Sequence, residues 1–88
     1  MNKILVSYDL IKVGKDYQSL YDYFDNFDYI KPLRSVYILW TSKPVEKVRD
    51  EIINLMDDND KLFVVDITNS MWGTYNLPKT VEWLNSHE

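Results

Sequence analysis

Segments of two-residue and 3.6-residue apolar periodicity alternate along this chain, and their order is what most constrains its fold. Residues 3–9 and 35–41 alternate apolar with polar side chains, which is typical of strands with one buried face. Residues 17–27 and 45–56 carry apolar side chains at helical spacings of three and four. Residues 62–67 form a nearly continuous apolar run, which favours a central strand.

Capping residues and prolines indicate where these segments begin or are interrupted. Asp16 is a suitable N-cap for the first helix, and Ser42 with Pro44 opens the second, because serine caps and proline fits a first turn. Pro32 allows at most a short edge strand over residues 28–34, which would form a hairpin with 35–41.

The order of elements predicts an α+β fold of the ferredoxin-like, split βαβ type (βαββαβ), with an antiparallel sheet and two helices on one face. We expect a single domain over residues 1–88. Its core spans residues 3–67, and a C-terminal strand or helix tail spans 68–88. A last short helix is expected from Asn76 and Pro78 to Leu84.

The second face of this sheet needs a cover, and a second copy of the chain could supply it. The alternation assigns these side chains to that face: Leu5, Ser7, Tyr37 and Leu39. A chain of 88 residues is only marginally stabilised by its own core. We therefore expect a homodimer or a higher homo-oligomer.

Composition narrows the classes of function. The formal net charge of −4 weighs against a protein whose main role is to bind long DNA or RNA. The chain has no cysteine, which excludes disulfides and thiolate catalysis and fits a reducing cytoplasm. No apolar run approaches a membrane span, and we expect residues 1–10 to form no signal peptide, so a cytoplasmic protein without a membrane partner is expected.

The junction from Tyr8 to Tyr17 carries the most direct chemical signal. A strand ends there in Asp9, and a loop with Lys12, Gly14 and Lys15 leads into a helix. Backbone N–H groups at such a junction, aided by the lysines, could hold a phosphate. The alternative is a solvated loop whose glycine allows a positive φ.

Two strings resemble a known family: Val6-Ser7-Tyr8-Asp9-Leu10 and Arg34-Ser35-Val36-Tyr37. They resemble the small CRISPR-associated ferredoxin-like nucleases, and most closely the stand-alone SinR-like proteins. In that family the aspartate that ends the first strand is the proposed metal ligand, supplied twice across a homodimer. The resemblance thus implies that Asp9 binds Mg²⁺ or Mn²⁺ in a nuclease, and that residues 68–76 pair as a strand across the dimer.

Aromatic residues could contact the base of a nucleotide rather than its phosphate. Tyr8 and Tyr17 flank the loop and could stack on a base or ribose. Trp72 and Tyr75 flank Gly73 and could close over a nucleobase as a lid, or could instead pack on the sheet or on a second subunit. A further set admits the same two interpretations, sheet packing or pocket wall: Ser35, Tyr37 and Trp40.

Three hypotheses about function follow. The first is a non-catalytic homodimeric binder of a small nucleotide or phosphorylated ligand that needs no cofactor. A phage protein that sequesters a defence-signalling nucleotide in the host cytoplasm would be one such case. The second is a metal-dependent nuclease or CRISPR-type assembly subunit with paired Asp9 carboxylates. The third is a structural, partner-binding module. The acidic charge favours the first over the second.

Overall fold

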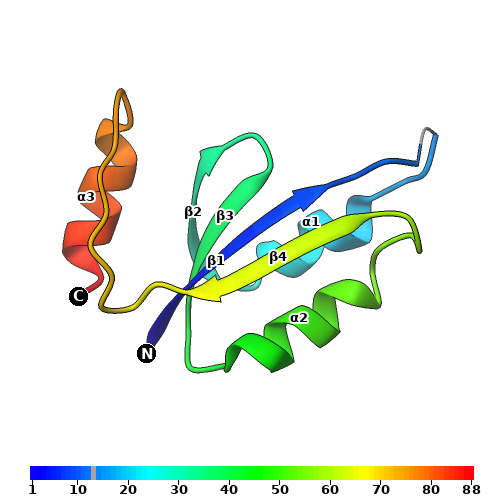
Figure 1. The fold of residues 1–88 in the computed structure, drawn as a ribbon, viewed down its shortest axis with the longest axis horizontal. Coiled ribbons are helices and arrows are strands. Elements are labelled where there is room, and N and C mark those ends of the chain that lie inside the picture. The colour runs from blue at the N-terminus through cyan, green and yellow to red at the C-terminus, as the bar shows by residue number, and fades with distance from the viewer. Residues whose placement is uncertain (13) are drawn as a thin grey trace.

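The computed structural model describes residues 1–12 and 14–88 and contains one four-stranded antiparallel sheet with three helices (Figure 1). The strands are β1 (Asn2–Asp9), β2 (Asp28–Leu33), β3 (Val36–Thr41) and β4 (Lys61–Asp66). The helices are α1 (Gln18–Phe24), α2 (Val45–Ile53) and α3 (Pro78–Ser86). The strand order is β2-β3-β1-β4, and each neighbouring pair is antiparallel. This order is compatible with the predicted ferredoxin-like α+β fold.

The first two helices form as the periodicity predicts, although both are shorter. A carboxylate oxygen of Asp16 accepts a hydrogen bond from the Gln18 N–H at 2.8 Å, but Tyr17 occupies the N-cap position of α1 and no side chain caps that helix. The predicted Asp16 cap is therefore wrong by one residue. Pro44 immediately precedes α2, but no side chain caps that helix. The predicted Ser42 cap is therefore wrong, because the extended backbone at Pro44 already sets the helix start.

The core lies between the sheet and the helices α1 and α2. Its fully buried side chains come from β1, β3, α1 and α2: Ile4, Val6, Leu20, Phe24, Leu39, Val48 and Ile52. The rings of Phe24 and Tyr37 stack with centroids 3.8 Å apart and planes within 15°. Aromatic pairs of this kind add to the stabilisation from burial alone.

Strand register corrects the assignment of faces on β3. Leu39 lies opposite Ile4, and Tyr37 lies opposite Val6. Because opposite residues in an antiparallel pair share a face, Tyr37 and Leu39 face the helices, and both are buried. Their predicted place on the second face is wrong. The β3 side chains on that face are Val36, Ile38 and Trp40.

The two edge strands differ in how they fit the predictions. β2 is an edge strand, as Pro32 indicates, and its pairing with β3 is irregular between Ile30 and Leu33. β4 was expected to be central but is the other edge. Its apolar run has a different cause, because Leu62 and Val64 pack on the core whereas Phe63 is 64% exposed on the second face.

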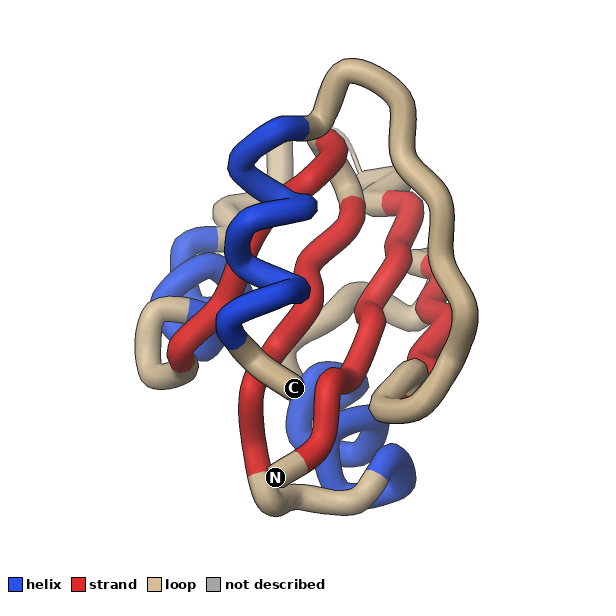
Figure 2. The backbone as a smooth tube through the Cα atoms, turned by 90° about the vertical axis from the view of Figure 1, so that its left-hand side faces the viewer, coloured by secondary structure: helices blue, strands red, loops and turns tan. Residues whose placement is uncertain are grey.

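Helix α3 lies on the second face of the sheet, on the side opposite α1 and α2 (Figure 2). It begins at Pro78, as predicted, packs on β2 and buries Thr80 and Leu84. The chain itself therefore covers the β2 side of this face. The part of the face over β1 and β4 carries Leu5, Ser7, Phe63 and Val65, and we call these four residues the open strip.

Removal of the Phe24 ring should destabilise the fold strongly. Phe24→Ala should lower the free energy of unfolding by about 3–5 kcal/mol, because it leaves a cavity between α1 and the sheet. Chemical denaturation measures this. Ile53→Ala is the matched control, because the Ile53 side chain is 51% exposed on α2 and should contribute little; equal losses in both variants would contradict the described core.

Candidate functional site

The loop predicted to hold a phosphate already has acidic partners. The Lys12 ammonium lies 3.4 Å from a carboxylate oxygen of Asp57, and the Lys15 ammonium lies 5.2 Å from the centre of the Tyr17 ring. Gly14 has a φ of 82°, as expected for a glycine turn. Val13, which belongs to the predicted loop, lies outside the described residues.

Asp60 is the acceptor that holds this loop in place. One of its oxygens accepts the Ile11 N–H and the Tyr17 hydroxyl, both at 2.8 Å, and the other accepts the Asp57 N–H at 2.8 Å. Burial raises the pKa of Asp60, but these hydrogen bonds outweigh it and lower the pKa below its usual value. Burial first, and then the bond to Asp60, raises the pKa of the Tyr17 hydroxyl.

This arrangement changes what the junction can do. Asp57 and Asp60 put negative charge beside the lysines, so an anion would have to displace an existing pair. Helix α1 has only seven residues, and Asp16 already accepts from one of its first N–H groups. The geometry is that of a tied structural loop, and the phosphate hypothesis stays a prediction.

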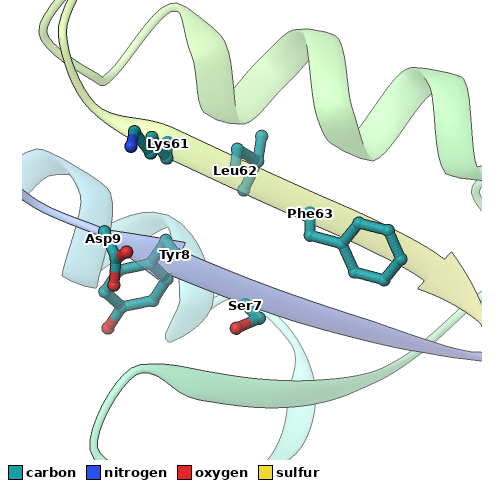
Figure 3. Close-up of a pocket in the computed structure, with 6 residues that line it drawn as sticks. All are labelled: Ser7, Tyr8, Asp9, Lys61, Leu62 and Phe63. Atoms are coloured by element: carbon teal, nitrogen blue, oxygen red, sulfur yellow. The ribbon is translucent and has the colours of Figure 1, made fainter.

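Asp9 lies at the exposed end of β1 and lines a shallow depression of about 170 Å³ (Figure 3). The other lining residues are Ser7, Tyr8, Lys61, Leu62 and Phe63. Small-molecule sites usually enclose roughly 300–1,000 Å³, so this depression suits a single side chain better than a nucleotide. Asp9 is opposite Lys61 in the register, yet Figure 3 shows the two side chains pointing apart.

No group of three or more histidine, cysteine, aspartate or glutamate side chains could hold a metal ion among the residues that the structure describes. Asp9 therefore belongs to no such group within the part of one copy that the structure describes. The metal hypothesis depends on a second copy, and the paired Asp9 carboxylates remain a prediction.

The predicted aromatic ligand contacts are dispersed through the fold. Tyr8 and Tyr37 are buried core residues, and the Tyr8 ring stacks on Phe24 with centroids 6.2 Å apart. Burial raises the pKa of Tyr8 to about 12. Tyr17 is buried beside Asp60. None of these three rings offers a free face for a base.

The other predicted site residues do not gather in one place. Ser35 belongs to the turn between β2 and β3, where its carbonyl accepts the Tyr8 N–H at 3.1 Å. The Trp40 ring packs edge-on against His87. Trp72 is 41% exposed and Tyr75 is 86% exposed, both on the connection between β4 and α3.

Phe63 and Met71 are exposed apolar residues that were not among the predicted site residues. Phe63 projects from the second face, and Met71 is fully exposed on the connection. Alternation within 62–67 was the available signal for Phe63, because Leu62 and Val64 lie on the opposite face. The exposed connection, residues 70–76, is called the aromatic arm below; it carries Met71, Trp72 and Tyr75.

Comparisons with known proteins do not place the chain in a family. No family model, no curated protein and no solved structure matches it. Among the described residues, no helix has the length and apolar character needed to cross a membrane.

The role of Asp60 predicts a stability effect that depends on pH. Asp60→Asn should lower the melting temperature at neutral pH, since it weakens the acceptor for Ile11, Tyr17 and Asp57. A carboxyl group whose pKa is lower in the folded protein stabilises the fold at pH values above its pKa in the unfolded chain, which is near 4. This stabilisation is lost as the pH falls through the pKa of the folded protein.

Thermal melts of both proteins between pH 7 and pH 2 test this expectation. The difference between wild type and Asp60→Asn should shrink towards low pH. Asp58→Asn is the control, because that exposed neighbour accepts no hydrogen bond among the described residues. A difference in melting temperature that stays constant from pH 7 to pH 2 would show that the ionised Asp60 carboxylate does not hold the loop.

Proposed function

We propose that this protein is a non-catalytic binding module that forms a homodimer through the open strip and the aromatic arm. The observation that carries the proposal is a set of large apolar side chains exposed on the α3 side of the sheet. Phe63, Met71, Trp72 and Tyr75 are 64, 100, 41 and 86% exposed. Aromatic residues and methionine are enriched in protein interfaces, and exposed apolar patches often mark them.

The helices cover only part of the sheet, which supports the same proposal. The side facing α1 and α2 is closed by the core, and α3 covers the β2 side of the other face (Figure 2). The open strip over β1 and β4 has no such cover among the described elements. A second copy meeting it about a two-fold axis would present the same apolar strip in return.

The outer edge of β4 favours a second copy over an unrelated partner. β4 pairs only with β1 among the described strands, which leaves its other edge without a ladder. Lys61 begins the strand and Asp66 ends it, with four apolar residues between them. In an antiparallel arrangement of two β4 strands, the positive end of each would lie near the negative end of the other.

The nucleotide-binding and nuclease hypotheses have less support from the geometry. The lysines of the loop face Asp57 and Tyr17, and the depression beside Asp9 is small. Both hypotheses remain open to their own assays. These are a thermal-shift screen of nucleotides with Lys12→Ala as the control, and a Mg²⁺- or Mn²⁺-dependent cleavage assay with Asp9→Ala.

Loss of the Phe63 ring should weaken the proposed dimer. Phe63→Ser is expected to raise the dimer dissociation constant by at least about tenfold, because an aromatic side chain central to an interface is often a dominant contact. Sedimentation equilibrium over a range of protein concentrations measures the constant directly.

Ile53→Ser is the matched control for this experiment. Ile53 is 51% exposed on α2, on the other side of the sheet, so its loss should leave the constant unchanged. A wild-type protein that stays monomeric at several hundred micromolar, or an equal effect of both variants, would contradict the proposed dimer.

A further inference from the structure

A compact cluster of side chains fastens α3 to the sheet. The His87 Nε2 atom lies 2.6 Å from Oδ2 of Asp28, at the start of β2, and the Trp83 indole N–H donates to Oδ1 of the same carboxylate at 3.1 Å. Only 15% of the His87 side chain is exposed. One carboxylate on β2 thus receives bonds from two residues at the end of α3.

The two ring nitrogens of His87 both face acceptors. Nδ1 lies 2.7 Å from the Trp83 carbonyl oxygen, and Nε2 faces the Asp28 carboxylate. A carbonyl and an ionised carboxylate cannot donate, and a neutral imidazole carries only one N–H. The Ser86 hydroxyl oxygen also lies 3.0 Å from Nδ1 and can either donate or accept there. Of the ring forms, only the protonated one, with two N–H groups, donates to both the Trp83 carbonyl and the Asp28 carboxylate.

The surrounding aromatic rings also favour a positive charge at this position. The Trp83 and His87 rings stack with centroids 4.0 Å apart and planes within 19°, and Trp40 packs edge-on at 5.2 Å. The face of an indole ring attracts a cation. Loss of the proton would therefore weaken the stacking contact as well as the bond to Asp28.

The other charged groups around His87 are few. β1 contributes Lys3, which lies opposite Trp40 and is buried, and β3 contributes no charge here. α3 and the residues after it carry Lys79, Glu82 and Glu88, and none of these forms an ion pair with His87 among the described residues. Asp28 is the one group that forms an ion pair with His87 in the part of the chain that the structure describes. The bonds from His87 and then Trp83 lower the pKa of Asp28, which keeps it ionised.

We propose that the contact of His87 with Asp28 and Trp83 is a pH-sensitive latch that holds α3 on the sheet at mildly acidic pH and loosens it above neutrality. Imidazole side chains change charge between about pH 5 and 8. The exposed aromatic arm tethers α3, and β2 is the element on which it mainly packs. Loosening α3 would uncover Ile30, Ile38 and Trp40, which share the second face with the open strip.

The consequence for assembly rests on the proposed function. If the dimer forms on the second face, release of α3 enlarges the apolar surface available to the second copy. Dimerisation should then strengthen as the pH rises from 5.5 to 8.0. The latch itself does not depend on the dimer, so the two can be tested separately.

Amide hydrogen exchange, corrected for the intrinsic effect of pH and followed at pH 5.5 and 8.0, tests the latch. The protection of the α3 amides should fall about fivefold at the higher pH, the size expected for loss of one partly exposed ion pair, while that of β1 should not change. His87→Phe keeps a ring on Trp83 but cannot titrate. Its α3 protection should be independent of pH, and Asp28→Asn should behave in the same way.

Glu82→Gln is the control, since this α3 carboxylate has no ion pair among the described residues, and it should keep the wild-type pH dependence. α3 protection that does not vary with pH in the wild type, or that varies equally in His87→Phe, would overturn the latch. Sedimentation at the same two pH values separates the proposals. A monomer with pH-dependent α3 exchange overturns the dimer alone, and a dimer with invariant exchange overturns the latch alone.

Discussion

The stack of Phe24 on Tyr37 is the contact on which the rest of the structure depends. Its 3.8 Å centroid separation joins α1 to β3, and the Tyr8 ring of β1 stacks on both. Because Tyr37 must face α1, its neighbours Val36 and Ile38 must face the other way. This one packing choice therefore decides which apolar side chains of β3 reach the second face.

Much of the fold follows from local pattern. The strands around residues 3–9 and 35–41 and the helix that follows Asp16 form where periodicity predicts them, and the last helix begins at Pro78 as predicted. The faces of β3 could not be predicted, because Val36, Ile38 and Leu39 are all apolar and either phase looks plausible. Only the register with Ile4 and Val6 on β1 resolves the choice.

The candidate site was harder to predict for a related reason. Lys12 has no acidic neighbour in the sequence, and its partner Asp57 belongs to a turn more than forty residues later. Asp60, which accepts from Ile11 and Tyr17, comes from the same turn. Long-range contacts of this kind leave no local signal. The same holds for His87, whose contacts with Asp28 and Trp40 join the end of the chain to β2 and β3.

The tied loop and the half-covered sheet lead to one account of the molecule. The lysine loop is held by contacts with Asp57 and Asp60, and large apolar side chains are exposed on the open strip and the aromatic arm, where we propose that a second copy binds. A net charge of −4 opposes close approach of two copies, and added salt should weaken that repulsion.

Chemical-shift changes on dilution test the central claim of self-association most directly. The account predicts concentration-dependent shifts of backbone amides at Ser7, Phe63 and Tyr75, with the exposed face of α2 unaffected. Spectra that do not change from micromolar to millimolar protein, or shifts confined to α2, would contradict it.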